Sequence, residues 1–525
     1  MGLQVSNMFS GKGKKPDENQ KGAGLIALTW NIAAINNNPF EYYITHKDPK
    51  YNELMEAVQE FIDNPGAADV TVDAVFTDEM FAELKALMEN ESWTGADQVA
   101  SLWETDYRKR KIISGFLKDK DIGSKRLASM PDRITNTIST TSGFAFRPCV
   151  INLYEGELSS GEQWWAAWSA FMFKNELEME TKHGVEAHRP CTMLSPISSA
   201  KYPAVTPEEE KISIPLQTLC VAIFDAILVH MMNQLAPGRW HSLKLSMCEA
   251  LGSKKGEKTL GILENIYFDA DIMFLQEVAA EWLRLFSASK MAKTFALLAP
   301  GQLDSKRNQN SVIVVRKELF ALESAEEVTK DVLEQLPKEA NVPVAAGDLC
   351  AYTVTSKKGN KWLLASFHGD TNGLATIPIV KAVHAVSEKS KDGRVVFGLD
   401  ANTYSKGQPG KTQDVSEFGE AYCSLGLTSC WGDKPDPESY TTFNTRTYLQ
   451  AQLNKAVRMA DRKTSPLTDR NPKDFILYRP EDFVHEVTIR DNTGSKTYDD
   501  EMPFPTLDFP SDHGIVATAL RVRMA

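Results

Sequence analysis

Near the end of the chain, an aspartate and a histidine stand side by side just before an apolar run. Asp512 and His513 belong to residues 510–514, and residues 515–520 that follow have the composition of a β-strand. Chemistry on a phosphate ester uses these two residue types, because a carboxylate oxygen can hold a divalent cation while an imidazole contacts the phosphate. Asp-His pairs are also common at strand starts without a catalytic role, so the pair gains meaning only from the rest of the chain.

Polar residues suited to the same chemistry stand at the ends of further apolar, strand-like runs. A glutamate at a strand end can bind a hard cation, and an amide can contact a phosphate that the cation holds. Because alternate residues of a strand share a face, two polar residues separated by one would point the same way if their strand continues. One such strand end is ordinary. Five of them together with the Asp512–His513 pair make six in one chain, which predict a metal-dependent phosphate site. The runs are residues 25–32, 271–278, 362–368, 394–402 and 473–478, and their polar residues are Asn31, Glu277, His368, Asp400 with Asn402, and Asp474.

The bulk composition is that of an ordinary soluble globular protein with more than one domain. The chain has 525 residues, of which 42% are hydrophobic and 24% charged. No segment reaches the roughly 18 uncharged apolar residues of a membrane span; residues 216–232 come nearest and predict a buried amphipathic helix. The formal net charge of −12 disfavours long-range attraction to nucleic acid. Seven scattered cysteines without a C-x-x-C pair indicate the reduced thiols of an intracellular protein.

The first residues indicate a lipid anchor. Residues 1–6 read MGLQVS, which fits the acceptor pattern for N-myristoylation at Gly2. One acyl chain binds a membrane only marginally, and Lys12, Lys14 and Lys15 supply a second signal of roughly 1 kcal/mol per lysine at an anionic surface. We therefore expect residues 1–22 to be a flexible, myristoylated tether that holds the protein at the cytoplasmic face of a membrane.

Residues 51–255 have helical rather than strand-like periodicity. Apolar residues recur at helical spacing in residues 54–62, and again in residues 81–88 after an N-cap candidate, Thr77. The aromatic run 164–173 is typical of a helix packed in a core. This region contains no repeat, no Gly-rich phosphate loop and no metal-type histidine or cysteine spacing. It predicts a mainly helical insertion of unknown role, either a lid over the site or a separate docking surface for a protein partner.

Taken in order, the strand ends resemble the endonuclease/exonuclease/phosphatase superfamily, which contains deoxyribonuclease I, abasic-site endonucleases, deadenylases, neutral sphingomyelinases and inositol polyphosphate 5-phosphatases. The resemblance covers residues 24–45 and about 256–525 and rests on the stretches TWNI, LQE, SFH, DAN, KDFI and PSDH. It implies an α/β (α+β) protein with the DNase I-like four-layer fold, a two-sheet β-sandwich flanked by helices. The implied domains are a family-like domain of residues 23–50 and 256–525 and the helical insertion of residues 51–255, for which we know no family equivalent.

The resemblance also implies a metal site. Glu277 and Asn31 would hold Mg²⁺, with Asp512 near it, and Mn²⁺ or Ca²⁺ are alternatives. This thin ligand set is sufficient, because Mg²⁺ keeps several waters and needs only one or two carboxylates besides substrate oxygens.

Catalytic roles follow from the same resemblance. Asp400 would activate or position the attacking water, and Asn402 would orient it. His513, held by Asp474, would polarise the scissile phosphate, and His368 would contact the phosphate oxygens.

Departures from the family pattern bear on the substrate. The usual Gly before the Asp-x-Asn motif is Leu399, and the loop after His368, residues 369–373, reads GDTNG. The aromatic-Cys-Asp-Arg signature of the inositol 5-phosphatases lacks its Cys and Arg at residues 472–475, which disfavours that branch. Three functions stay open: a membrane-associated hydrolase of a lipid or small phosphoester, a nuclease or deadenylase, and a membrane-anchored scaffold or interaction protein on a hydrolase-like platform.

Overall fold

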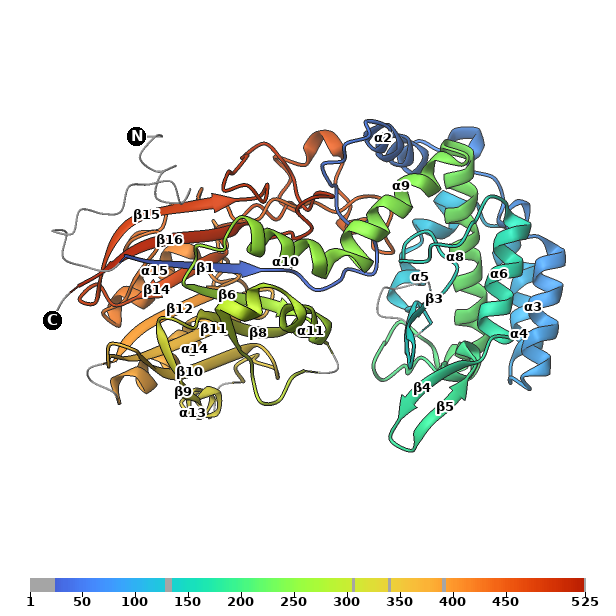
Figure 1. Cartoon of the computed structure of the whole chain (residues 1–525). Coiled ribbons are helices and arrows are strands. Elements are labelled where there is room, and N and C mark those ends of the chain that lie inside the picture. Colours follow the sequence, from blue (N-terminus) through green and yellow to red (C-terminus); the bar gives the residue numbers. More distant parts are fainter. Residues whose placement is uncertain (1–23, 128–134, 305–306, 339–340, 390–392, 524–525) are drawn as a thin grey trace. The chain divides into compact units, whose positions relative to one another are not determined.

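The computed structural model describes residues 24–127, 135–304, 307–338, 341–389 and 393–523, which form two compact units (Figure 1). Unit 1 comprises residues 1–35, 253–444 and 469–525, and unit 2 comprises residues 36–252 and 445–468. The lipid anchor predicted at Gly2 and the basic cluster of Lys12, Lys14 and Lys15 lie outside the described residues.

The division places residues 253–255 in unit 1 rather than in the insertion, and it places two longer segments differently from the boundaries expected from the sequence. Residues 36–50 and 445–468 belong to unit 2, although both were assigned to the family-like domain. The two segments bond to each other through the backbone, with Tyr43 N–H donating to Thr445 O and Thr447 N–H donating to Glu41 O, both at 2.9 Å. A pairing between segments some 400 residues apart leaves no local signature in the sequence.

Unit 1 is built on two six-stranded sheets, each with one parallel pair among antiparallel neighbours. In the first sheet the parallel pair is β1 with β6, and in the second it is β11 with β12. The first sheet has the order β15 (Phe483–Asp491), β16 (Ile515–Val522), β1 (Gly24–Asn31), β6 (Ile272–Val278), β8 (Asn310–Arg316) and β7 (Phe295–Leu298). The second has the order β13 (Thr428–Ser429), β14 (Asp474–Tyr478), β12 (Arg394–Asp400), β11 (Lys361–His368), β10 (Leu349–Ser356) and β9 (Phe320–Glu327).

The two sheets pack face to face because their strands are apolar on both sides. In β1, Ala27 faces the core between the sheets, whereas Leu28 and Trp30 face the helices on the outer side. This alternation follows from the two-residue period of a strand. Gly398 of β12 leaves room for Phe274 of β6, because a Cβ at Gly398 would meet the Phe274 ring at 2.4 Å.

Helices cover both outer faces of the sandwich, which completes four layers (Figure 1). Residues of α10 and α11 pack on the first sheet, and residues of α14 and α15 pack on the second. This is the DNase I-like architecture expected from the resemblance, and the fold prediction is confirmed. The helices of unit 1 are α10 (Lys255–Asn265), α11 (Ala280–Ala288), α12 (Met291–Thr294), α13 (Thr329–Leu333), α14 (Thr376–Glu388) and α15 (Val415–Ser424).

Unit 2 is mainly helical and carries two β-hairpins. Thr77 caps the helix that follows it by accepting from Met80 N–H, as its position predicts, and Ser160 caps the aromatic helix in the same way. The helices are α2 (Lys50–Asp63), α3 (Asp78–Asn90), α4 (Ala96–Thr105), α5 (Lys120–Ser124), α6 (Gly161–Phe173), α7 (Pro207–Lys211), α8 (Ser213–Leu235) and α9 (Arg239–Cys248). The hairpins are β2 (Thr137–Thr140) with β3 (Gly143–Phe146) and β4 (Leu177–Thr181) with β5 (Gly184–His188).

The long apolar helix of unit 2 is α8. It passes the length and hydropathy test for a membrane span, with a mean hydropathy of 1.8, but 89% of that window is buried inside the protein. The prediction of a buried helix is therefore confirmed, whereas its amphipathic character is not, because α8 is buried on nearly all of its faces. A helix that is apolar all round belongs in a core.

Candidate active site

The site forms where the parallel strand pairs of the two sheets end. Asn31 at the end of β1 pairs with Gln276 of β6, and His368 at the end of β11 pairs with Asp400 of β12. Asp474, at the start of the antiparallel β14, pairs with Asp400 from the other side. The sheet register therefore places polar residues from five strands, predicted separately from the sequence, at the same end of the sandwich.

Asn31 connects the two sheets through its side-chain amide. Its Nδ2 donates to Glu277 Oε1 and to Asp400 Oδ2, both at 3.0 Å, while its Oδ1 accepts from Ala33 N–H at 2.8 Å. The amide is fully buried. Two acidic side chains from different sheets thus converge on one point.

Glu277 is turned into the site by an irregularity in β6. The register between β6 and β8 shifts between Leu275 and Val278, and Glu277 adopts a left-handed backbone with φ of 56°. Such strained backbone in a residue other than glycine is typical of functional sites. Burial by itself would raise the pKa of Glu277, but the His368 imidazole, the Ala34 N–H and the Asn31 amide outweigh it and lower that pKa to about 2. The carboxylate is therefore ionised at neutral pH.

Asp400 and Asn402 come together by a different route from the one expected. The strand β12 ends at Asp400, so the two side chains do not share a strand face. Asn402 instead adopts a left-handed backbone with φ of 47°, and its N–H donates to Asp400 Oδ1 at 2.9 Å. Its Nδ2 lies 3.4 Å from Asp400 Oδ2. A turn, rather than the period of a strand, places Asn402 beside Asp400.

Gly373, in the loop after His368, approaches this turn closely. A Cβ at Gly373 would lie 2.6 Å from Asn402 O, and its φ of 71° is left-handed. A glycine is therefore required there for both reasons.

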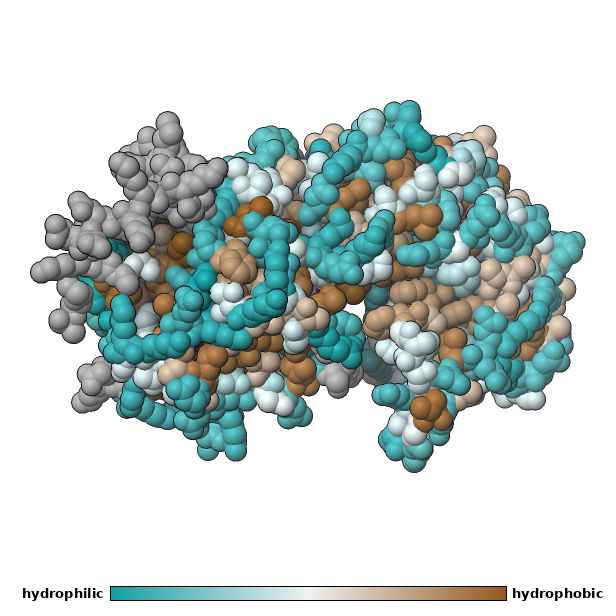
Figure 2. Space-filling view, viewed as in Figure 1, coloured by the Kyte–Doolittle hydropathy of each residue, from teal (hydrophilic) through white to brown (hydrophobic). Residues whose placement is uncertain are grey.

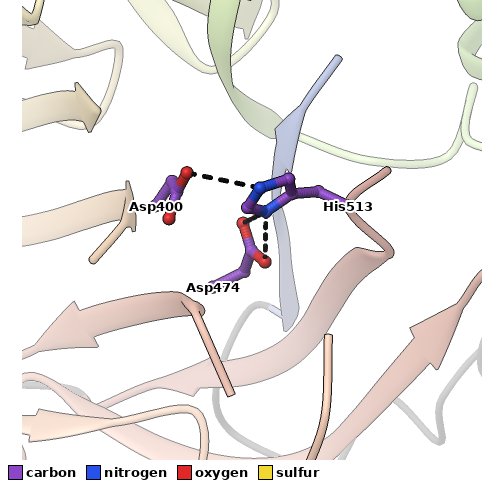
Figure 3. Close-up of side chains that lie close together, drawn as sticks. All are labelled: Asp400, Asp474 and His513. Atoms are coloured by element: carbon purple, nitrogen blue, oxygen red, sulfur yellow. Dashed lines mark hydrogen bonds and ion pairs between the residues drawn. The ribbon is translucent and has the colours of Figure 1, made fainter. Parts of the chain in front are cut away.

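His513 is held in place by Asp474, and both face Asp400 (Figure 3). His513 Nδ1 lies 3.0 Å from Asp474 Oδ2, and its Nε2 lies 3.6 Å from Asp400 Oδ2. Asp474 Oδ2 also accepts from Thr441 Oγ1 at 2.6 Å, which fixes the carboxylate. Burial by itself would lower the pKa of His513, but the charges of Asp474 and Asp400 outweigh it and raise that pKa to about 10. The imidazole is thus protonated at neutral pH, with one N–H directed at the site.

The backbone of the Ser-Asp-His stretch is fastened to β1. Ser511 Oγ donates to Asn31 O at 2.6 Å and accepts from His513 N–H at 3.1 Å, and Trp30 Nε1 donates to His513 O at 3.0 Å. The neighbouring Asp512 is half-buried. These bonds hold residues 511–513, which precede β16, against β1 and set the position of His513.

His368 lies between the two acids. Its Nε2 is 3.4 Å from Glu277 Oε1 and 3.7 Å from Asp400 Oδ2, and its side chain is 17% exposed. It is the most accessible of the imidazoles at this site, which suits contact with an entering phosphate.

The donor set fits a hard divalent cation. The carboxylates of Glu277 and Asp400 converge on the Asn31 amide, and an Asp474 oxygen lies within 4.8 Å of an Asp400 oxygen. Oxygen ligands of this kind suit Mg²⁺ or Mn²⁺. Asn31 directs its amide nitrogen, which is not a metal ligand, at the carboxylates, so direct metal contact by Asn31 needs its amide turned by half a rotation. The metal roles of Glu277, Asn31 and Asp512 stay predictions.

Sequence reasoning missed three residues around the site. Thr441 orients Asp474, Lys473 is buried and contacts Asp469 Oδ2 at 2.7 Å, and Lys255 is buried near Glu277. Neither Thr441 nor Lys255 stands at the end of an apolar strand, so the strand-end signal could not find them, whereas Lys473 opens the run 473–478 and was given no role. Lys255 also fell inside the segment assigned to the insertion.

Comparisons with known proteins bear on the two units separately. A profile for a domain of unknown function, DUF8234, matches residues 69–245, which lie within unit 2. No curated protein sequence matches the chain.

Solved structures similar to this chain cover about half of it. TDP2 from D. rerio, complexed with a single-strand DNA product, has 15% identity and a TM-score of 0.32, and covers 50% of this chain and 90% of its own. The human Nocturnin catalytic domain has 17% identity and a TM-score of 0.33, covering 52% and 90%. An endonuclease/exonuclease/phosphatase family protein from Bacteroides thetaiotaomicron has 16% identity and a TM-score of 0.33, covering 51% and 89%. Unit 1 has the DNase I-like fold, as its two sheets and flanking helices show. Its strand-end residues resemble those of the endonuclease/exonuclease/phosphatase superfamily.

Proposed function

We propose that unit 1 is a divalent-metal-dependent phosphoester hydrolase. The observation that carries the proposal is the meeting of Glu277 and Asp400 across the Asn31 amide, directly beside the His513–Asp474 pair. Two acids placed this close, one buried and one partly buried, are costly to a fold unless a cation or other donors compensate their charge. Their position at the ends of parallel strands, where open α/β sheets bind ligands, supports the same reading.

The side chains divide the chemistry among them. Asp400 is placed to accept a proton from an attacking water, and Asn402 is placed to orient that water. His513, protonated and held through Nδ1 by Asp474, presents its Nε2–H to a phosphate oxygen. A cation held by Glu277 and Asp400 would neutralise the negative charge that builds up on the phosphate.

The first experiment is hydrolysis with Mg²⁺ and with EDTA across one panel of substrates: single-stranded RNA, plasmid DNA, sphingomyelin liposomes and phosphoinositide vesicles. Turnover of one substrate that requires both the metal and Asp400 supports the proposal and chooses between a lipid and a nucleic-acid substrate. A folded wild-type protein that is inactive on every substrate of the panel contradicts it.

We further propose that the enzyme acts at a membrane, on a lipid or small phosphoester. The support is the acylation pattern at Gly2 with Lys12, Lys14 and Lys15 close behind it. Gly2→Ala is expected to move the protein from the membrane to the soluble fraction, with loss of the myristoyl mass. A wild-type protein that is soluble and carries no acyl group would contradict this part of the proposal.

An interaction role for unit 2 is the second candidate. The surface in Figure 2 is mainly hydrophilic with small hydrophobic patches, and Phe144 and Val185 in the two hairpins are 55% and 62% exposed. Single exposed apolar side chains are ordinary on a protein surface, so these two positions are candidate contact points for a partner only if they belong to one larger apolar patch. Nucleic acid is the less favoured partner, because the chain has a net charge of −12.

A further inference from the structure

A buried lysine lies beside the site and has no part in the chemistry described so far. Lys255 opens α10 and is only 6% exposed. Its Nζ donates to Ala34 O at 2.9 Å, while Ala34 N–H donates to Glu277 Oε2 at 2.7 Å. Ala34, which follows β1, thus connects the ammonium group of Lys255 with the carboxylate of Glu277 through its backbone.

The ammonium group of Lys255 has no ion-pair partner among the residues that the structure describes. Lys473, the other buried lysine of unit 1, contacts Asp469 Oδ2 at 2.7 Å. Burying a cation without such a partner is costly. The negative charges that act on Lys255 are those of Asp512 and Glu277, farther away and within the site itself. Burial lowers the pKa of Lys255 to about 8, so most of the amine is still protonated at pH 7.

A buried lysine can also serve only to hold a backbone carbonyl. Lys244 of unit 2 donates its Nζ to Cys149 O at 2.7 Å and is fully buried. The acids near Lys255 are different, because Glu277 and Asp512 belong to the strand ends that form the phosphate site. A test must therefore separate a purely structural lysine from one that contacts the substrate.

We propose that Lys255 is a phosphate-binding residue and that it makes the site select phosphomonoesters. An ammonium group has three N–H donors, and Ala34 takes one of them. A phosphomonoester carries nearly two negative charges at neutral pH and three terminal oxygens, whereas a diester carries one charge and two such oxygens. Lys255 would supply a further positive group, besides His513 and the metal, for the additional charge and oxygen of a monoester. This inference rests on the proposed function and names the substrate class of the same site, whether the phosphate is on a small molecule or on a lipid headgroup.

The first test measures binding of inorganic phosphate in the presence of Mg²⁺ by calorimetry, which needs no turnover. Lys255→Met is expected to weaken phosphate binding by about tenfold, the usual effect of removing a charged hydrogen bond. Lys255→Arg keeps the charge and should retain most of the binding. The control is Lys254→Met, which changes the exposed neighbouring lysine and should leave binding unchanged. Unaltered phosphate binding by folded Lys255→Met overturns the inference.

The second test compares 4-nitrophenyl phosphate with bis(4-nitrophenyl) phosphate. Lys255→Met is expected to raise KM for the monoester by about tenfold and to change KM for the diester by less than about threefold. If Lys255 only held Ala34 in place, both substrates would suffer equally, and that result overturns the inference. Phosphatidic acid vesicles, assayed beside 4-nitrophenyl phosphate, then distinguish a lipid monoester from a small one.

Failure of the proposed function and failure of the inference about Lys255 give different results. If wild type hydrolyses no phosphoester but its phosphate binding depends on Lys255, the proposed function fails and the phosphate contact stands. If wild type is active and Asp400-dependent while Lys255→Met and Lys255→Arg equal wild type in both tests, the proposed function stands and the inference fails.

Discussion

Each unit buries a cluster of charged side chains, and the two clusters are satisfied in opposite ways. In unit 2, Asp225 has no exposed surface and accepts from Arg147 Nε at 2.7 Å, from Cys149 Sγ at 3.0 Å and from Trp168 Nε1 at 3.0 Å. Arg147 in turn donates to Thr135 Oγ1 at 3.1 Å. Asp225 is paired with the Arg147 cation, and Cys149 and Trp168 donate the remaining hydrogen bonds to its carboxylate.

In unit 1 two acids, one buried and one partly buried, approach each other. Glu277 and Asp400 approach one Asn31 amide, and imidazoles lie beside them, with His368 at 3.4 Å from Glu277 and His513 at 3.6 Å from Asp400. Two acids this close together cost stability, and strained backbone at Glu277 and Asn402 adds to that cost. The cluster of unit 2 is thus an acid–cation pair completed by neighbouring donors, whereas the cluster of unit 1 brings two acids together, as the proposed metal site requires.

The strongest test of this contrast removes the acid at the centre of the unit 1 cluster. Asp400→Asn is expected to lower turnover by roughly a thousandfold or more, because the water-positioning acid and a cation ligand are lost together. The melting temperature should not fall, since one of two adjacent acids becomes neutral. Steady-state kinetics and calorimetry measure the two effects. Glu420→Gln, an exposed acid-to-amide change in α15, serves as the control, and substantial activity in folded Asp400→Asn would refute the site.

The opposite result is expected in unit 2. Asp225→Asn leaves the Arg147 charge buried without its partner, which should lower the free energy of unfolding by roughly 3–5 kcal/mol. Urea denaturation measures the loss, and turnover per folded molecule should stay the same. Glu56→Gln, at an exposed position of α2, is the matched control. A loss below about 1 kcal/mol would contradict the structural assignment of this pair.

Metal binding gives a third, smaller effect. Mg²⁺ or Mn²⁺ at about a hundred times its Kd should stabilise the wild type by about 2.7 kcal/mol, and EDTA should reverse the gain. Glu277→Gln is expected to lose this response, because its carboxylate is ionised at neutral pH and an amide binds the cation poorly. Thermal denaturation with and without metal measures it. Equal metal responses in the two proteins would remove Glu277 from the metal site.

The pH dependence of stability tests the His513–Asp474 pair without metal. The pKa of His513 is raised in the folded protein, so its contribution to stability is fully present below the unfolded pKa of about 6.5 and is lost as pH rises through about 10. In EDTA, the difference in melting temperature between wild type and His513→Gln should therefore be largest near pH 6 and should shrink toward pH 10. A difference that stays constant over this range would show that His513 does not carry the charge.

Much of unit 1 could be predicted locally. The runs that became β1, β6, β11, β12, β14 and β16 are short and apolar, and the polar residue that ends or begins each run is visible in the sequence. A strand buried on both faces has little choice of composition, so its ends stand out. The same signal found Asn31, Glu277, His368, Asp400 and Asp474, because each stands at the end or start of a buried strand.

Other features depend on partners far along the chain. Residues 445–468 join unit 2 through pairing with residues near 41–43, which no local pattern shows. Asn402 reaches Asp400 through a left-handed turn, and Lys255 reaches the site through the Ala34 carbonyl. Thr441 orients Asp474 from a segment that lies outside the named strands.

The sequence by itself determined which residue types stand at the ends of buried strands, because burial keeps charged side chains out of the strand interiors. The tertiary structure decided which of those ends meet and in what order they bond. Asn31 and Asp400 are 369 residues apart and touch at 3.0 Å only because two sheets pack face to face. The charge of His513, set by Asp474 and Asp400, is likewise a property of that packing and not of any single segment.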